Sequence, residues 1–287
     1  MVLTTNSAFA RNLDISANDV NPIELSQFKT ALRIVTLANG STEVVSALGL
    51  RSAIVGRDIA STSPEFKSIP IVTSGHQVIA EKVISLKPDL VIVDPSVGPK
   101  TAIDAIKRAK IEIFTISEAW TVGEIHKKIA QIGKILGQTN KAQKLNALMN
   151  QAIGSAKQNT GWKPKMVFLY LRGPSSIYLL GGKGSGADSL INSIGGIDVG
   201  AKNLKNPFST LTSEALVAAN PDVILVMTKG LQSVGGESGL LKLPGVAQTN
   251  AGKYRRILSV DDSLLLSFGP RTPALLLRMS EALRAFK

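Results

Sequence analysis

Residues 74–94, SGHQVIAEKVISLKPDLVIVD, decide the fold of this chain. The segment predicts a short helix from Glu81, a Pro-Asp turn and a strand whose unbroken apolar run is typical of a parallel sheet covered on both faces. The same order returns at residues 212–227, TSEALVAANPDVILVM, where Glu214 again stands seven residues before a Pro-Asp pair. An α/β unit that occurs twice, more than a hundred residues apart, predicts two similar lobes rather than one continuous sheet.

The composition narrows the class of protein. The 287 residues suffice for two domains, 44% are hydrophobic, and no apolar run approaches the ~18 residues of a membrane helix. Basic residues exceed acidic ones by 33 to 21, but the lysines are scattered and only 5% of residues are aromatic, so we expect no nucleic-acid binding. The absence of cysteine excludes disulfides, thiolate metal sites and cysteine catalysis.

The pattern of expected elements divides the chain into four parts. Residues 1–30 are polar without a sustained period and predict a flexible leader. Residues 31–137 and residues 163–287 alternate strands with helices and predict an N-terminal and a C-terminal α/β lobe with mainly parallel sheets. Residues 138–162 predict a long rigid helix that links the lobes, with a ligand cleft between them, since Gly137 breaks the helical period. The alternative is that both helices around Gly137 pack on the first lobe.

One of the two histidines lies where a ligand is expected. His76 follows a glycine in a loop before a helix, at the carboxyl side of the predicted sheet, where open α/β folds bind ligands. A loop histidine can also serve only as a hydrogen-bonding residue. His126 falls within a helical pattern and is interpreted as a surface or packing residue.

Tyr170 and Arg172 form the second candidate group. They lie two positions apart at the end of a predicted strand, so both side chains point to one face of the sheet. A guanidinium beside a phenol stabilises the phenolate, and tyrosinate is a known axial ligand of haem iron. Such a pair is also compatible with an ordinary strand-end hydrogen bond.

Other loops carry weaker signals. GGKGSGAD has glycines between a strand and a helix, as phosphate-binding loops do, but it matches no complete phosphate motif and is interpreted as a tight turn or a contact with an anionic group. Arg57, Arg271 and Lys183 follow strands and are candidates to hold ligand carboxylates, or else are solvated loop charges. Glu81 and Glu214 begin equivalent helices, which indicates helix-end electrostatics or two acidic contacts for a basic partner.

These residues together resemble a known family. The repeated E-x6-PD unit, RIVTLANGSTEVVSALGL and the closing FGPRTPALL are similar to substrate-binding proteins of ABC importers for ferric siderophores, cobalamin and haem. The resemblance covers residues 31–287. Within that group, GRDIAST, TSGHQ, YLRG, GLQSVGG and GPRTPA look most like haem-binding members of the HmuT type, with the class III periplasmic-binding-protein fold.

The resemblance implies roles for particular residues. It implies ferric haem b (protoporphyrin IX) held between two lobes, with His76 and Tyr170 as axial ligands of the iron. The Y-x-R motif of the family maps onto Tyr170 and Arg172, and Met227 falls in the strand-end region that lines the pocket. The two docking glutamates for the ABC permease map onto Glu81 and Glu214. The relatives in Gram-positive bacteria are lipoproteins, so we expect an extracytoplasmic protein, either a cell-surface lipoprotein or a periplasmic protein. The cysteine that carries the lipid in those relatives is absent from this sequence.

We therefore expect a haem carrier of an ABC importer and not an enzyme. Arg57 and Arg271 are expected near the haem propionates. The alternative is a carrier of the same fold for a ferric siderophore or cobalamin, in which His76 and Tyr170 only line the pocket. A chelatase or a nucleotide-dependent enzyme is disfavoured because the sequence has no paired acid and base, no complete phosphate motif and no nucleophile-base pair.

Overall fold

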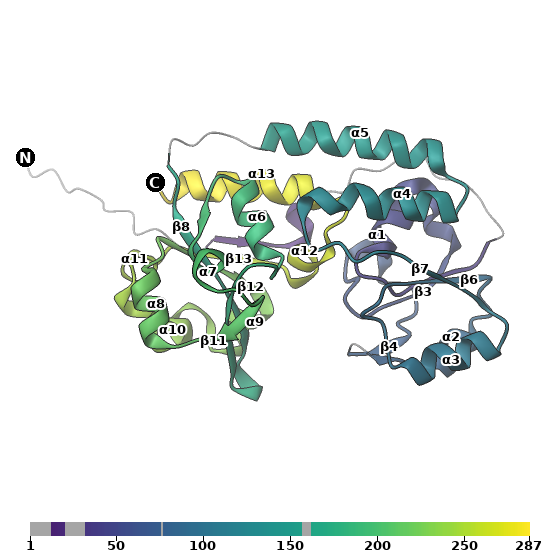
Figure 1. Ribbon diagram of the computed structural model, residues 1–287, viewed down its shortest axis with the longest axis horizontal. Coiled ribbons are helices and arrows are strands. Elements are labelled where there is room, and N and C mark those ends of the chain that lie inside the picture. The colour runs from purple at the N-terminus through teal and green to yellow at the C-terminus, as the bar shows by residue number, and fades with distance from the viewer. Residues whose placement is uncertain (1–12, 21–31, 76, 157–161) are drawn as a thin grey trace, which may run out of the picture. The chain divides into compact units, whose positions relative to one another are not determined.

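The computed structural model describes residues 13–20, 32–75, 77–156 and 162–287 (Figure 1). The chain divides into two compact units, and each is built from separate stretches of sequence. The N-terminal unit contains the described residues of 17–156 and 262–276. The C-terminal unit contains the described residues of 1–16, 157–261 and 277–287.

A parallel four-stranded sheet is the centre of the N-terminal unit. Its strands are β2 (Ile34–Thr36), β3 (Ile54–Arg57), β6 (Leu90–Val93) and β7 (Glu112–Thr115). The order is β3-β2-β6-β7, and every neighbouring pair is parallel. All residues of β2 and β6 are buried, as expected for central strands covered on both faces. A short antiparallel hairpin, β4 (Thr73–Ser74) and β5 (Gln77–Val78), stands apart from this sheet.

Helices surround this sheet. They are α1 (Ser41–Val45), α2 (Ala80–Ser85), α3 (Lys100–Arg108), α4 (Ile125–Ile135), α5 (Thr139–Ala156) and α12 (Asp262–Ser267). Valines of β2 and β6 pack against Val83 of α2 and Ile106 of α3 in one buried cluster. The predicted break at Gly137 is confirmed, because this residue has a φ of 65° between α4 and α5.

The C-terminal unit has a seven-stranded mixed sheet. Its strands are β1 (Leu13–Ile15), β8 (Lys165–Arg172), β9 (Ile177–Gly181), β10 (Ile197–Asp198), β11 (Phe208–Thr210), β12 (Val223–Met227) and β13 (Ile257–Val260). The order is β1-β13-β12-β8-β9-β11, with β10 paired to β8. β9 and β11 run antiparallel to their neighbours, whereas the other pairs are parallel. The helices are α6 (Ala187–Ser193), α7 (Val199–Asn203), α8 (Ser213–Ala219), α9 (Thr228–Ser233), α10 (Gly236–Leu240) and α11 (Asn250–Lys253). Helix α13 (Thr272–Ala285) begins in the N-terminal unit and belongs to the C-terminal unit from residue 277 on.

The repeated Pro-Asp turn has the same structure in both units. Asp89 accepts a hydrogen bond from the backbone N–H of Arg33 at 2.7 Å, and Asp222 accepts one from the backbone N–H of Lys165 at 2.9 Å. In each unit the donor stands at or just before the first residue of the adjacent strand. The aspartate thus joins the turn to that strand and supplies a partner for a backbone donor. This explains why the motif precedes the buried strand in both copies.

The structure differs from the predicted division of the chain in three places. Residues 13–15 fall within the predicted leader, yet they form β1 and extend the C-terminal sheet beside β13. Residues 262–276 were assigned to the C-terminal lobe, but they belong to the N-terminal unit. The predicted linking helix corresponds to α5, which lies beside α4 in the N-terminal unit (Figure 1), where Asn146 donates to the backbone oxygen of His126 at 3.0 Å. That contact corresponds to the alternative arrangement of the two helices.

Candidate functional site

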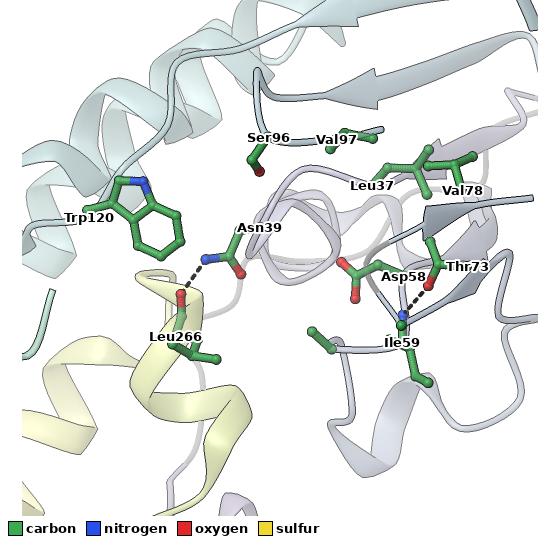
Figure 2. Close-up of a pocket in the computed structure, with 12 residues that line it drawn as sticks. Leu37, Asn39, Asp58, Ile59, Thr73, Val78, Ser96, Val97, Trp120 and Leu266 are labelled. Carbon is green, nitrogen blue, oxygen red and sulfur yellow. Dashed lines mark hydrogen bonds between the residues drawn. The ribbon is translucent and has the colours of Figure 1, made fainter. Parts of the chain in front are cut away.

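A cavity of about 140 Å³ opens at the carboxyl edge of the N-terminal sheet (Figure 2). Each strand of this sheet ends near the cavity, since the carboxyl ends of parallel strands meet at one edge. The lining residues follow β2 (Leu37, Asn39), β3 (Asp58, Ile59, Ala60), β6 (Ser96, Val97) and β7 (Trp120), or come from the hairpin (Thr73, Gly75, Val78) and α12 (Leu266). Most of the lining is aliphatic or aromatic, as in pockets for small organic ligands.

Asp58 supplies a carboxylate to the wall of this cavity. Its Oδ1 accepts the backbone N–H of Ser61 at 2.6 Å, and its Oδ2 lies 3.2 Å from the Ser61 hydroxyl. That hydroxyl is also 2.9 Å from Oγ1 of Thr42. Burial raises the pKa of Asp58 to about 6, although the hydrogen bonds from Ser61 and the charge of Arg57 oppose the shift. Asp58 therefore titrates closer to neutral pH than an ordinary carboxyl.

Asp94 holds two lining residues in place. It accepts the backbone N–H of Asn39 at 2.9 Å and both the N–H and the hydroxyl of Ser96, at 3.0 and 2.5 Å. The side-chain amide of Asn39 also donates to the backbone oxygen of Leu266 (Figure 2). These bonds join the loops after β2 and β6 to α12, so the shape of this side of the cavity depends on long-range contacts.

Trp120 forms an aromatic part of the wall (Figure 2). Its indole N–H donates to Glu118 at 2.9 Å, and its backbone N–H donates to Glu124 at 3.1 Å. The side chain remains 36% exposed, which leaves ring surface for a ligand. Trp120, Asp58 and Asp94 were not among the site residues predicted from the sequence. The available signal was their position, because all three closely follow a strand that ends at this edge.

His76, the proposed first ligand, lies outside the described residues. Its neighbour Gly75 lines the cavity and has a φ of 56°, a conformation that glycine adopts without steric cost.

Tyr170 and Arg172 lie at the carboxyl end of β8 in the C-terminal unit, and both side chains are half-buried. The guanidinium carbon of Arg172 lies 4.8 Å from the centre of the Tyr170 ring, so the two side chains share a face of the sheet as the spacing predicts. The contact is a cation–π stack over the ring. The ring of Phe208, from β11, meets Tyr170 with a centroid distance of 5.7 Å and an interplanar angle of 63°.

The two arginines predicted to meet carboxylates are not solvated loop charges. Arg57 is buried and donates to the backbone oxygens of Phe66 and Asp58, at 3.0 and 3.1 Å. Arg271 is 1% exposed and forms an ion pair with Glu43. Neither is among the described residues that line the cavity. Both guanidinium groups therefore serve the interior of the N-terminal unit, because burial requires partners for their charge.

Met227 and Lys183 have contrasting environments. Met227 ends β12 and is fully buried within the sheet, whereas Lys183 is exposed in the loop before α6. Glu81 and Glu214 are both exposed in the first turns of α2 and α8, where a carboxylate complements the helix dipole. A partner can therefore reach both carboxylates.

The glycine-rich loop is occupied by a side chain of the protein itself. Asp188 in α6 accepts the backbone N–H of Gly184 at 2.9 Å and that of Gly186 at 3.1 Å. An anionic ligand would need to displace this carboxylate from the same N–H groups. The loop is therefore a tight turn, one of the two interpretations that the sequence allowed.

None of the helices within the described ranges combines the length and the apolar character that crossing a bilayer requires.

Comparison with known proteins finds binding proteins with similar sequences and structures. The model of a family described as periplasmic binding protein matches residues 34–264. The periplasmic haem-binding protein RhuT from Roseiflexus sp. RS-1, solved in apo form, is 35% identical with a TM-score of 0.84, over 90% of this chain and 100% of RhuT. YvrC of Bacillus subtilis, an uncharacterised ABC transporter substrate-binding lipoprotein, is 32% identical over 90% of this chain and 81% of its own length. The vitamin B12-binding protein of Salmonella typhimurium is 26% identical over 79% of this chain and 84% of its own.

Proposed function

The chain belongs to the periplasmic binding protein family, and we propose that it carries ferric haem b to the permease of an ABC importer. Members of this family are extracytoplasmic substrate-binding proteins of transport systems and not enzymes. The family includes carriers of haem and of cobalamin, so the family alone leaves the cargo undecided. The choice of haem depends on the chemistry of particular side chains.

The observation that carries this proposal is the environment of Tyr170. Its ring contacts the guanidinium of Arg172 and, in an edge-to-face arrangement, the ring of Phe208, at the carboxyl end of β8. Tyrosinate is an anionic oxygen ligand suited to ferric iron, and a guanidinium close to the bound phenolate would compensate its negative charge. We therefore assign Tyr170 as an axial ligand and Arg172 as the group that stabilises its charge.

His76 is proposed as the other axial ligand. It is one of only two histidines, and its neighbour Gly75 lines the cavity of the N-terminal unit. The aliphatic and aromatic lining of that cavity suits the apolar edge of a porphyrin. The roles of Arg57 and Arg271 at the propionates stay predictions, and the buried positions of both guanidinium groups do not support direct contact. Met227 as a residue that lines the haem pocket also stays a prediction.

A hemin titration of the purified protein tests the proposal. We expect a shifted Soret band that saturates with added hemin, a changed spectrum in His76→Ala, and loss of the ferric–tyrosinate absorption in Tyr170→Phe. His126→Ala and Tyr254→Phe are matched controls, because both residues are exposed and His126 lies on helix α4. An unchanged hemin spectrum in the presence of the wild-type protein would exclude haem as the cargo.

Cobalamin is the second candidate cargo, and the similarity to the Salmonella vitamin B12-binding protein motivates it. A ferric siderophore is a further possibility within the same fold. Direct competition between hemin and cyanocobalamin separates the first two. Tight cobalamin binding that Tyr170→Phe leaves intact, together with weak hemin binding, would favour the cobalamin carrier.

Glu81 and Glu214 are proposed to dock the carrier on its permease. Both are exposed, and each starts the helix of one Pro-Asp repeat. We expect the double change to alanine to abolish haem uptake in cells while hemin binding by the isolated protein stays intact. Glu112→Ala is the control, since Glu112 is an exposed carboxylate on β7. A lipid anchor also stays a prediction, which detergent phase partitioning of the protein from its native host would test.

A further inference from the structure

The two faces of β8 have different surroundings. Val167, Leu169 and Leu171 belong to the buried apolar cluster of the C-terminal unit, so the odd-numbered residues face its core. Side chains of a strand alternate between the two faces. Tyr170 and Arg172 therefore lie on the face opposite that core, and both are half-buried.

Neighbouring strands extend this face with apolar side chains. Tyr170 pairs with Leu179 of β9, and Arg172 pairs with Ile177. Directly paired residues of antiparallel strands point to the same side of a sheet. Ile177 is 41% exposed and Leu179 is half-buried, so the surroundings of Tyr170 offer accessible apolar surface.

Phe208 reaches this face from β11, which is separated from β8 by β9. Phe208 pairs with Gly181 of β9, and a Cβ atom at Gly181 would lie 2.9 Å from Cδ1 of Phe168. The missing side chain lets aromatic rings meet above the intervening strand. Phe208 forms edge-to-face pairs with Phe168, at 6.4 Å, and with Tyr170, at 5.7 Å between ring centroids. Both geometries are in the favourable range for aromatic pairs.

We propose that Phe208 is a positioning residue for the Tyr170 phenol and that its exposed surface contacts the apolar face of the haem. The inference rests on the proposed function, because it assigns a role at the same ligand. Phe208 remains 38% exposed beside the exposed Ile177, so apolar surface on this face is accessible to a ligand. The edge contact of Phe208 and the stacked guanidinium of Arg172 restrict the Tyr170 ring before the ligand arrives. Restriction of this kind lowers the entropy lost on binding.

Variants of Phe208 test this role by hemin affinity and by the ferric–tyrosinate bands in absorption and resonance Raman spectra. We expect Phe208→Ala to weaken hemin binding about 3- to 10-fold, the range that the loss of one aromatic pair predicts, and to broaden or shift the tyrosinate bands. Phe208→Tyr keeps the ring and should restore both properties. Phe208→Leu keeps apolar surface without a ring edge, so the bands should change more than the affinity. Thermal unfolding checks that each variant is folded.

Tyr254→Ala is the matched control. Tyr254 is a more exposed aromatic residue of the C-terminal unit, at 57%, and stacks on Arg256. Its removal should change neither affinity nor bands. Folded Phe208→Ala and Phe208→Leu proteins with wild-type affinity and wild-type tyrosinate bands would overturn the positioning role while leaving haem binding in place. Failure of the wild-type protein to bind hemin would instead overturn the proposed function.

Discussion

Glu43 and Arg271 form an ion pair inside the N-terminal unit, although 228 positions separate them in the sequence. Their side chains are 3% and 1% exposed. Arg271 belongs to residues 262–276, a segment that enters this unit while the residues on either side of it belong to the other one. The ion pair therefore fastens this returning segment to α1.

Removing one partner should destabilise the protein strongly. Arg271→Ala leaves the buried Glu43 carboxylate without its ion-pair partner, which costs about 3–5 kcal/mol in the free energy of unfolding. Arg278→Ala, which breaks the exposed pair with Glu281 at 3.1 Å, should cost less than about 1 kcal/mol. Urea denaturation measures both values. Similar losses in the two variants would contradict a structural role for the buried pair.

Lys128 forms a second contact that holds residues 262–276 in the N-terminal unit. Its ammonium group donates to the backbone oxygens of Asn39, Ser267 and Phe268, at 2.7, 2.9 and 3.1 Å. Burial lowers its pKa to about 8, against the opposing charges of Glu43 and Asp94, so it stays mainly protonated at neutral pH. Lys128→Met should cost about 3 kcal/mol, because three buried acceptors lose a charged donor.

The local effect of Lys128→Met distinguishes this role from a general loss of stability. Hydrogen exchange should accelerate first in residues 262–269, which the ammonium group ties to the loop after β2. Lys127→Met is the control, since Lys127 is exposed on the same helix. Uniform acceleration across the N-terminal unit would count against the proposed attachment.

Asp58 should make stability depend on pH. Burial raises its pKa from 3.8 to about 6, so the native state binds more protons than the unfolded chain between about pH 4 and 6. This carboxyl therefore favours the folded state most below pH 4 and contributes less as the pH rises through 6. Asp58→Asn keeps an acceptor for Ser61 but cannot ionise. Between pH 4 and 7 the variant should gain up to about 3 kcal/mol relative to the wild type.

Denaturation curves at a series of pH values measure this difference. Glu112→Gln is the control, because Glu112 is an exposed carboxylate of the same unit. Parallel pH profiles for the wild type and Asp58→Asn would show that the buried carboxyl has no raised pKa.

Trp120 should report ligand binding at the cavity. The chain has two tryptophans, so Trp162→Phe leaves Trp120 as the only indole. Hemin with its apolar edge in the cavity would lie close to Trp120 and quench its fluorescence by energy transfer. The reverse variant, Trp120→Phe, keeps Trp162, which stacks on Arg256 at 5.2 Å in the C-terminal unit. Weaker quenching of Trp120 than of Trp162 would place the ligand elsewhere.

Much of the architecture follows from local patterns in the sequence. The two Pro-Asp repeats predict the α/β class, which is confirmed, because an apolar run after a helix and a turn is enough to specify a buried parallel strand. The spacing of Tyr170 and Arg172 places both side chains on one face, because strand alternation is a property of the backbone. Gly137 also marks the helix break for a local reason, because glycine readily adopts the left-handed conformation that ends a helix.

Contacts between distant segments could not be predicted from those local patterns. Nothing near Arg271 in the sequence indicates that its partner is Glu43, and nothing near residues 13–15 indicates that they pair with β13. The N–H groups of the glycine-rich loop suggest an anion site until the fold shows Asp188 bound to them. Likewise, Phe208 meets Tyr170 only because β11 follows β9 in the sheet and Gly181 leaves room between them.

The sequence by itself thus determined the fold class, the two Pro-Asp repeats and the shared face of Tyr170 and Arg172, since these depend on residue type and on periods of a few residues. The tertiary structure decided which charges are buried, which loops enclose the cavity and which ring supports the phenol. These features depend on contacts between residues that are far apart in the sequence. Such contacts are set by the packing of the whole chain and not by any local pattern.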